Sequence, residues 1–572
     1  MLFDSVSFIN KMNLLNNSVK RKELKQYQDP RSPKLNINIR IERNFPFEYI
    51  GQIIDPLFST WSTKAFITYS DYDSTFSKPL INEDIDVYIL WVDWREYYDK
   101  MSPSEAVGWL KSRIEYINQG SNRRVIVNNW PESLDYNELM FSPILGKRDW
   151  FKQLNIELNK EIKNISSCEV IDIALVAQII GINSYDGRNE QVSNYPFSNQ
   201  FTIEIARHLA LRMLPVLFYP RIKALVLDLD DTLYTGVLGE SSYTDVIITD
   251  KHLFFHQLLK DMKNSGTMLA LCTRNEEQDV KDFFEKRAEI KLKWEDFAVV
   301  CANWNPKSEN IAVIARKLNI DTTAMLFIDD NISELAKAAS VHSKLNLLLA
   351  DPTGKETIHR LLNYPGVYYL NKDESASLRT VDVQSNLERE KLRDIAYDYN
   401  TYLSSLKMKI TVYENFKDHK NRIYELSHKT NQFNLALKRI NEQMSKEVIN
   451  SPEYKTFTVN LSDVLSDSGI IGVFICKIND NFATFEEILF SCRALGRRVE
   501  SVSFLWVLKR LQEMGIKKLN FEVQEGLRNA PAIDWLKRLT NEEFIEIKLN
   551  EIIKVVEGKV KSHPAEVISV YE

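Results

Sequence analysis

The sequence predicts an α/β multidomain protein in which two α/β domains precede an α+β domain. Its 572 residues are too many for one hydrophobic core, and at roughly 150 residues per domain we expect three domains. Between about residues 38 and 350, short apolar runs alternate with helical patterns, which is typical of parallel βαβ units. From about residue 408, strand-like runs succeed one another more directly. We place the domains at 1–218, 219–372 and 373–572.

The first domain follows a polar stretch, residues 1–35, that we expect to be poorly ordered in part. Apolar runs predict its strands at 65–70, 87–94, 124–129 and 168–178. Helical patterns lie near residues 104–118, 149–163 and 199–213. A stretch with two prolines, residues 215–223, is interpreted as the linker to the second domain.

The other two domains differ in how their strands alternate with helices. In the second domain, strands are predicted from the runs ALVLDLD, TMLALCT, DFAVVCAN, AMLFIDD and LNLLLA, with helices between them. A charged helical stretch, residues 373–406, leads into the third domain. There, mostly antiparallel strands are predicted from MKITVYEN, YKTFTVNLSD, GIIGVFICKIN, FATFEEILFS and KKLNFEVQ, with helices near 417–427, 500–513 and 531–540.

The composition argues against several classes of protein. The chain carries a net charge of −6 and lacks the Lys/Arg run typical of a nucleic-acid binder. No stretch of about 18 apolar residues could span a membrane, and the N-terminus lacks signal-peptide features. The 5 cysteines are scattered singly, which fits reduced thiols. We therefore expect a cytoplasmic protein that binds neither nucleic acid nor membrane.

Three acids follow the first strand of the second domain, in LVLDLDDTLYTG (225–236). Ligands of open parallel sheets bind at the carboxyl ends of the strands. Residues two apart on a strand point the same way, so Asp228 and Asp230 can face one site. Two close carboxylates need a cation between them, and oxygen ligands suit Mg²⁺. Taken alone, however, DxDxT is equally consistent with a turn cap.

The next three strand ends favour catalysis over a turn cap. TMLALCT ends at Thr273, Lys307 follows DFAVVCAN, and AMLFIDD ends in Asp329 and Asp330. Phosphoryl transfer needs a carboxylate nucleophile and a second acid for the leaving oxygen. It also needs a hydroxyl and an ammonium for the phosphoryl oxygens, and further acid for a metal. The intervening stretches are too short for a cap domain, which predicts an open site.

These motifs, over about residues 222–350, resemble the capless haloacid dehalogenase (HAD) superfamily. The resemblance implies Asp228 as nucleophile and Asp230 as general acid/base. It implies a Mg²⁺ site formed by Asp228, the Asp230 backbone carbonyl, and Asp329, Asp330 or both. It also implies that a group of residues after the strands binds phosphate, namely Thr232, Thr273, Arg274, Asn275 and Lys307.

Two stretches of the third domain suggest an acyl-binding site. SCRALGRRVE (491–500) follows a strand and precedes a helix, and exposed amides in such a loop bind anions. Gly496 permits close backbone approach, and Arg493 and Arg497 can meet phosphates. The loop resembles the pyrophosphate loop of the GNAT acyltransferase fold, which receives CoA or a phosphopantetheine arm. KTNQFNLALKR (429–439) mixes a helical pattern with amides that we expect to contribute, namely Asn431, Gln432 and Asn434.

The thiol of Cys492 lies in that loop. Cationic neighbours and a helix N-terminus would lower the pKa of this thiol and let it carry an acyl group as a thioester. The alternative is a small buried hydrophobe. His428 could act as a base, although a lone His is more often structural. The remaining cysteines are expected in the core, namely Cys168, Cys272, Cys301 and Cys476.

Taken together, seven motifs over about residues 219–540 resemble the FkbH-like family: LVLDLDDTLYTGVLGE, LALCTRNEE, NWNPKSENI, LFIDDN, HKTNQFNL, SGIIGVF and SCRALGRRVE. These bacterial proteins join a capless HAD domain to a GNAT-like domain, and some carry an N-terminal domain similar to SGNH hydrolases. Residues 1–218 resemble that N-terminal domain more loosely. They lack a Gly-Asp-Ser motif and a convincing DxxH, so we expect this domain not to be catalytic.

The resemblance implies a phosphatase and glyceryl transferase of polyketide assembly. It would dephosphorylate a phosphorylated three-carbon donor such as 1,3-bisphosphoglycerate and load the glyceryl unit on an acyl carrier protein, through the carrier's phosphopantetheine thiol. Relatives commonly have Asn where this chain has Asp231, and often Cys where it has Ala224, which shifts the acyl role towards Cys492. Two alternatives remain: a GNAT-type acyltransferase for an amine or sugar with an auxiliary phosphatase domain, or a non-catalytic scaffold that docks a carrier protein.

Overall fold

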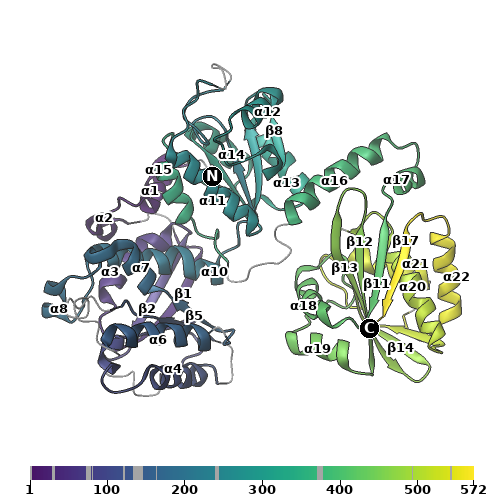
Figure 1. The fold of residues 1–572 in the computed structure, drawn as a ribbon, viewed down its shortest axis with the longest axis horizontal. Coiled ribbons are helices and arrows are strands. Elements are labelled where there is room, and N and C mark those ends of the chain that lie inside the picture. Colours follow the sequence, from purple (N-terminus) through teal and green to yellow (C-terminus); the bar gives the residue numbers. More distant parts are fainter. Residues whose placement is uncertain are drawn as a thin grey trace. The chain divides into compact units, whose positions relative to one another are not determined.

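The chain forms two compact units, Met1–Ala376 and Ser377–Glu572. The computed structural model describes residues 3–28, 32–72, 79, 81–119, 123–132, 146–162, 164–238, 244–369, 378–491, 494–541 and 544–571. The first unit contains two five-stranded sheets, and the second contains one seven-stranded sheet (Figure 1). The two sheets of the first unit lie in the ranges expected for two α/β domains, whose exact boundary stays a prediction.

The first sheet is parallel throughout, in the order β2-β1-β3-β4-β5. Its strands are β1 (Leu35–Arg43), β2 (Thr63–Tyr69), β3 (Val87–Trp91), β4 (Arg124–Asn128) and β5 (Cys168–Ile171). Every residue of β3 is buried, as in a parallel sheet covered on both faces. The accompanying helices are α3 (Glu48–Ser59), α4 (Pro103–Ile117), α6 (Lys147–Ile162), α7 (Ile173–Ile180), α8 (Gly187–Ser193), α9 (Asn199–Arg207) and α10 (Leu214–Phe218).

Two expectations for this part of the chain are corrected. The apolar run 168–178 is not one strand, because Asp172 ends β5 and caps α7 by accepting the Leu175 N–H at 2.9 Å. The stretch 215–223 does not start as a linker, because Pro215 occupies the first turn of α10, where its missing N–H costs nothing. The apolar pattern of residues 168–178 alone did not show that a strand ends and a helix begins there; the capping residue Asp172 marks that boundary.

The N-terminal stretch contains two helices among its described residues, and the expectation that it is poorly ordered in part stays a prediction. It forms α1 (Ser5–Leu15) and α2 (Arg21–Gln26). Phe8, Met12 and Leu15 recur at helical spacing and are buried, so α1 has one apolar face. That face packs against α15 (Lys355–Leu362) (Figure 1). Next to it, the Arg360 guanidinium donates to Asn16 Oδ1 at 2.8 Å.

The second sheet is also parallel throughout, in the order β10-β9-β6-β7-β8. Its strands are β6 (Ala224–Leu227), β7 (Met268–Thr273), β8 (Phe297–Ala302), β9 (Met325–Asp329) and β10 (Asn346–Leu349). The chain moves outward from β6 to β8 and then returns to build β9 and β10 on the other side. The connecting helices are α11 (Asp250–Asn264), α12 (Glu277–Lys286), α13 (Lys307–Leu318) and α14 (Ile332–Val341). The predicted strands and helices of this region are confirmed.

The second unit is an α+β structure built on a mixed sheet in the order β16-β15-β14-β13-β12-β11-β17. Its strands are β11 (Lys409–Glu414), β12 (Tyr454–Ser462), β13 (Asp467–Asn479), β14 (Phe482–Phe490), β15 (Lys518–Phe521), β16 (Ile547–Lys548) and β17 (Glu566–Tyr571). The run β11 to β14 is antiparallel, as predicted. Its helices are α16 (Leu378–Ile395), α17 (Tyr399–Ser405), α18 (Lys420–Lys429), α19 (Glu442–Asn450), α20 (Val499–Glu513), α21 (Ala530–Thr540) and α22 (Leu549–Val560).

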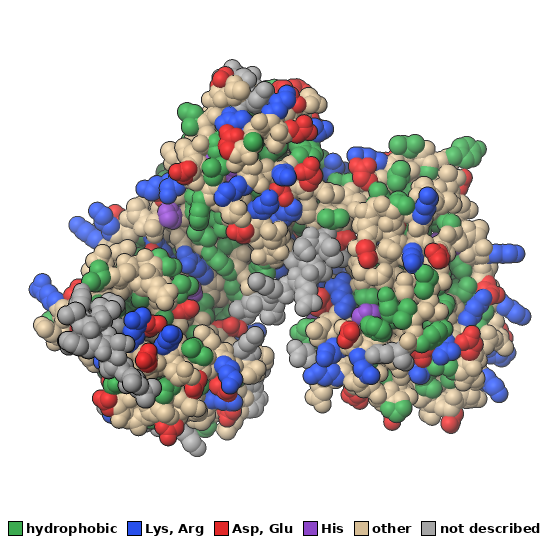
Figure 2. Space-filling view, in the orientation of Figure 1, with side chains coloured by type: hydrophobic (Ala, Val, Ile, Leu, Met, Phe, Trp, Pro, Cys, Tyr) green, Lys and Arg blue, Asp and Glu red, His purple; other side chains and the backbone are tan. Residues whose placement is uncertain are grey.

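This sheet carries a hydrophobic core on each face. The larger core includes residues of α20, α21 and α22, and the smaller one includes residues of α18 and α19. Figure 1 shows these two helix groups on opposite flanks of the sheet. Among the described residues, no helix combines the length and apolar character needed to cross a bilayer. On the face shown in Figure 2, Lys and Arg side chains are interspersed with Asp and Glu.

Candidate active site

Acids and an ammonium from three strand ends meet at the carboxyl edge of the second sheet. Lys307, the first residue of α13, is buried, and its Nζ lies 2.7 Å from both Asp228 Oδ1 and Asp329 Oδ2. Asp228 follows β6 and Asp329 ends β9, the two neighbouring strands at which the strand order reverses. Open parallel sheets bind ligands at such a switch point. Three predicted site residues are therefore in direct contact, and their catalytic roles stay predictions.

Burial governs the charges of this group. It raises the pKa of Asp228 to about 7, although the Lys307 ammonium acts in the opposite direction. Burial also raises the pKa of Asp329, again against Lys307. Burial by itself would lower the pKa of Lys307, but the two carboxylates raise it above its ordinary value. Lys307 is therefore cationic and favours the ionised form of both acids.

Three carboxylates form a cluster that fits a divalent cation. Asp228, Asp329 and Asp330 each offer an oxygen, and these oxygens lie within 4.8 Å of one another. Burial and the neighbouring Asp329 and Asp231 raise the pKa of Asp330 to about 6. Clustered carboxylate oxygens suit Mg²⁺, which prefers hard oxygen ligands. The sequence left open whether Asp329 or Asp330 would complete a metal site, and the structure places both beside Asp228.

Asp230 contacts the segment that follows β7. Asn275 Nδ2 donates to Asp230 Oδ2 at 2.8 Å and to Thr273 Oγ1 at 2.9 Å. A side-chain amide has two N–H donors, so both donors of Asn275 are used inside the protein. The side-chain amide has no donor left for phosphate in this conformation, and the expectation that Asn275 binds phosphate stays a prediction. Its observed role is to tie the Asp230 carboxylate to the Thr273 hydroxyl.

The turn after Asp230 explains why a third acid stands at this strand end. Asp231 adopts a left-handed backbone with φ of 49°, and its Oδ1 accepts the Gly236 N–H at 2.8 Å. Asp and Asn tolerate this conformation better than most residues, because their short side chains bond locally. Thr232 is buried, and its hydroxyl has no hydrogen-bond partner within the described part of the chain. Its phosphate contact stays a prediction.

Polar and aromatic side chains follow two neighbouring strands of this sheet, β7 and β8. The Arg274 guanidinium lies 3.4 Å from Glu334 Oε2, and 40% of the side chain is exposed. Trp304 is 64% exposed, and its indole N–H donates to Glu276 Oε1 at 2.6 Å. Sequence reasoning missed Trp304 and Glu276. Their positions just after β8 and β7, among the predicted site residues, would have been the signal.

Comparison with known proteins gives structural likenesses without a family assignment. No family model matches the chain, and no curated protein matches it. Among solved structures, it is similar to the N-terminal part of a Bacteroides fragilis protein that contains a phosphatase domain complexed with Mg. The two share 21% identity over 63% of this chain and 100% of that chain, with a TM-score of 0.49.

Two further likenesses concern other parts of the chain. A spermidine N-acetyltransferase from Vibrio cholerae is 14% identical, with a TM-score of 0.19, over 25% of this chain and 96% of its own. A member of the lipolytic G-D-S-L family from Veillonella parvula is 12% identical, with a TM-score of 0.23, over 31% of this chain and 98% of its own. The matched proteins thus include a phosphatase domain, an acetyltransferase and a lipolytic protein.

The predicted anion loop of the second unit is described from Ala494 onward. Cys492 and Arg493 lie outside the described residues, so their roles stay predictions. Gly496 has φ of +78°, and a Cβ there would meet open space, so backbone conformation rather than close approach requires glycine. The Arg497 guanidinium is buried 2.8 Å from Asp463 Oδ2, and burial together with Arg389 lowers its pKa to about 10. Arg497 therefore has a structural partner.

The amides assigned to acyl binding divide into two groups. Asn431 and Gln432 are exposed. Asn434 is fully buried, its Oδ1 accepts the Leu437 N–H at 2.6 Å, and its backbone carbonyl accepts Asn529 Nδ2 at 2.8 Å. Contact between Asn434 and a pantetheine arm is therefore not supported in this conformation, whereas the two exposed amides remain candidates.

The segment that carries these amides is not helical. β14 pairs with β15 over Phe482–Phe485, and beyond that point residues 433–435 take the place of β15. The Leu435 N–H donates to the Ile488 carbonyl at 2.9 Å, and the Gln524 N–H donates to the Leu435 carbonyl at 3.0 Å. The chain thus fills the gap between its own diverging strands, as an added peptide strand would.

Four cysteines are buried in the core, as expected, whereas the candidate base His428 is exposed. The structure buries Cys168, Cys272, Cys301 and Cys476. The exposed ring of His428 lies with its Nδ1 3.0 Å from the Tyr424 carbonyl of its own helix. His428 thus makes a local contact within α18, and both roles considered for it, a base and a structural residue, stay predictions.

The carboxyl edge of the first sheet is closed by side chains. Phe45, just after β1, stacks on Trp91 with ring centroids 5.1 Å apart and meets the Trp130 ring edge-on at 5.5 Å. All three rings are buried. Asn44 and Asn128 also face inward, where their Oδ1 atoms accept backbone N–H groups at 2.7 Å. The strand ends that could have formed a second site are used for packing and loop anchoring.

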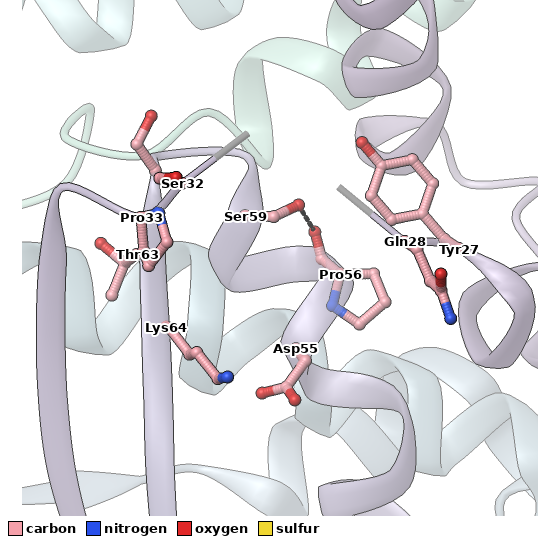
Figure 3. Close-up of a pocket in the computed structure, with 10 residues that line it drawn as sticks. Tyr27, Gln28, Ser32, Pro33, Asp55, Pro56, Ser59, Thr63 and Lys64 are labelled. Atoms are coloured by element: carbon pink, nitrogen blue, oxygen red, sulfur yellow. Dashed lines mark hydrogen bonds between the residues drawn. The ribbon is translucent and has the colours of Figure 1, made fainter. Parts of the chain in front are cut away.

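A cavity of about 420 Å³ lies at the opposite, amino edge of the first sheet. Figure 3 shows Asp55 of α3 and Lys64 of β2 among its lining residues, with the Ser59 hydroxyl donating to the Pro56 carbonyl. Burial raises the pKa of Asp55, while Lys64 acts against that shift. None of the described residues that line this cavity was singled out from the sequence, and these residues form no cluster of acids.

Proposed function

We propose that this chain is a Mg²⁺-dependent phosphatase and glyceryl transferase of the FkbH-like type. It would remove phosphate from a phosphorylated three-carbon donor and deliver the acyl unit to the phosphopantetheine thiol of a carrier protein. The observation that carries the phosphatase part is the buried Lys307, held 2.7 Å from both Asp228 and Asp329 where the strand order reverses. The acyl part rests on the sequence resemblance.

The residues present can perform a two-step displacement at phosphorus. Asp228 attacks the phosphorus while the bond to the leaving oxygen breaks, and Asp230 gives its proton to that oxygen. The products are an aspartyl phosphate on Asp228 and the free alcohol. Water then attacks the phosphorus and passes its proton to Asp230, which releases inorganic phosphate and restores Asp228. Lys307, beside the nucleophile, offsets negative charge in both steps.

A bound Mg²⁺ would add neutralisation of the phosphoryl oxygens. Asp228, Asp329 and Asp330 would hold it through carboxylates, and their clustered oxygens fit this requirement. The Asp230 carbonyl is the further ligand that the resemblance implies.

The first experiment measures Mg²⁺-dependent phosphate release from p-nitrophenyl phosphate. Asp228→Asn should lower kcat by about three orders of magnitude, because the nucleophile is lost. A matched control is Asp296→Asn, since Asp296 is also buried and paired, at 2.6 Å from Lys263, but lies just before β8, at the opposite, amino edge of the sheet. Equal activity of Asp228→Asn and wild type would disprove the proposal, and release of phosphate by wild type would exclude the docking scaffold.

The acyl half is tested by mass spectrometry of the intact proteins. The chain is incubated with Mg²⁺, a phosphorylated three-carbon acyl donor and a holo carrier protein. A glyceryl mass on the carrier supports the proposal, and a glyceryl adduct on the Cys492→Ala variant would show that Cys492 is not the acyl acceptor. Transfer of an acyl group from CoA to an amine by Asp228→Asn would instead favour the GNAT-type alternative.

A further inference from the structure

The Asp230 carboxylate is held by three donors within the described residues. The Tyr234 hydroxyl donates to Oδ1 at 2.5 Å, the Leu238 N–H donates to Oδ1 at 2.9 Å, and Asn275 Nδ2 donates to Oδ2 at 2.8 Å. A carboxylate offers about four acceptor positions on its two oxygens. Oδ1 has two of these donors and Oδ2 has one, so the remaining acceptor position lies on Oδ2.

The Tyr234 hydroxyl has little freedom to move. The side chain is fully buried, and its ring centroid lies 4.7 Å from that of Phe283 on α12. The turn that carries it is tied to α11, because His256 Nε2 lies 2.8 Å from the Leu233 carbonyl. Packing against α11 and α12 therefore fixes the Tyr234 hydroxyl in its position beside Asp230.

We infer that Tyr234 is a positioning residue for proton transfer to the leaving oxygen, acting through Asp230. This inference rests on the proposed phosphatase function. Two donors fix Oδ1, so the carboxylate presents Oδ2 as the atom that releases the proton when the bond from phosphorus to the leaving oxygen breaks. Without the Tyr234 hydroxyl, only the Leu238 N–H remains of the two donors at Oδ1, so the carboxylate is held less firmly about its last side-chain bond and the proton is less well aimed.

The test compares leaving groups that differ in their need for a proton. The leaving group of an alkyl phosphate such as glycerol 3-phosphate is a strongly basic alkoxide, which needs a proton. The leaving group of p-nitrophenyl phosphate is a stabilised phenolate, which does not. Tyr234→Phe should lower kcat/KM for the alkyl ester by about 10–100-fold and for the nitrophenyl ester by less than about 3-fold, with little change in KM. The ratio kcat/KM reports the step in which the leaving group departs.

The matched control is Tyr364→Phe, which removes another fully buried hydroxyl of the same unit, away from these acids. It should change both substrates alike. Asn275→Ala removes the donor at Oδ2 and should show the same preference for the good leaving group. If Tyr234→Phe folds poorly, equal loss on both esters in Asn275→Ala would overturn the inference, because the orientation of the Asp230 carboxylate would then not matter. Thermal unfolding of each variant identifies such a folding defect.

The outcomes distinguish failure of the inference about Tyr234 from failure of the proposed phosphatase function. If wild type is active and Tyr234→Phe loses equal activity on both esters, or none, then Tyr234 is a packing residue and the inference is overturned. If wild type releases no phosphate from either ester with Mg²⁺, the proposed function fails, and the inference falls with it. A selective loss on the alkyl ester supports both.

Discussion

A buried ammonium holds together two buried carboxylates at the carboxyl edge of the second sheet. Lys307 lies between Asp228 and Asp329, which are both almost inaccessible to solvent. Burying two carboxylates without a counter-charge is strongly unfavourable. With Lys307 between them, the attraction of the ammonium offsets much of the cost of burying their charge. The same contact therefore serves the stability of the first unit and the charge of the nucleophile.

Lys307→Met should destabilise the first unit by about 3 kcal/mol in the absence of divalent cations, because the acids lose their partner. Mg²⁺ should then raise the melting temperature of this variant more than that of wild type, since a cation can replace the missing charge. Differential scanning calorimetry with and without Mg²⁺ measures both effects. Lys263→Met, which breaks the Lys263–Asp296 pair, is the control and should show no enhanced response to Mg²⁺. An equal Mg²⁺ response in all three proteins would contradict this account.

At the scale of elements, α11 carries a buried neutral histidine against the turn that follows Asp230. Burial lowers the pKa of His256 to about 4, although its bond to the Leu233 carbonyl favours the cation. A histidine whose pKa is lower in the folded than in the unfolded chain stabilises the fold above the unfolded pKa. That stability is lost as the pH falls from about 6.5 to about 4.

The first unit should therefore lose up to about 3 kcal/mol of unfolding free energy through His256 as the pH falls across that window. His256→Gln should flatten the dependence, because the amide keeps a donor for the Leu233 carbonyl and does not titrate. Urea unfolding at several pH values between 4 and 7 measures the slope. Burial lowers the pKa of His208 to about 4 as well, so part of the slope should persist in the variant. An unchanged slope would show that His256 does not contribute.

Sequence patterns were enough to predict the strands and helices of the second sheet, and also which residues lie together at its carboxyl edge. Asp228, Thr273 and Asp329 were placed together because parallel strands present their carboxyl ends at one edge. The helical pattern of residues 429–439 was misleading, because its decisive contact is remote. Glu487 of β14, buried and raised in pKa to about 7, accepts the N–H groups of Ala436 and Lys438 and holds the segment extended.

The same limit applies to the finer parts of the site. The contact between Tyr234 and Asp230 spans four residues and could have been suspected from that spacing. The contact of Asn275 with Asp230 spans 45 residues, and sequence reasoning assigned the amide to phosphate instead. Residue types at strand ends therefore predict which groups gather, whereas the direction of each hydrogen bond depends on packing that a single sequence does not reveal.

At the scale of the whole molecule, each unit has its own cores and should fold without the other. The two clusters of the second unit draw all their residues from Tyr402 to Val560. Residues 1–376 expressed alone should keep kcat/KM on p-nitrophenyl phosphate within about 3-fold of the full chain, since independent domains retain their sites. Residues 377–572 should fold cooperatively and lack this activity. Loss of phosphate release by the first fragment, if it is folded, would mean that the site needs the second unit.

The docking of α1 has a consequence for how the protein is made. Asn16 and its partner Arg360 are 344 residues apart in the chain. At 5–20 residues per second, the ribosome delivers α15 about 20–70 s after α1. During that time, α1 can pack against α3, which it also contacts, but lacks α15. The first sheet can therefore be complete before α1 reaches its final packing, so the apolar face of this helix is only partly covered during synthesis.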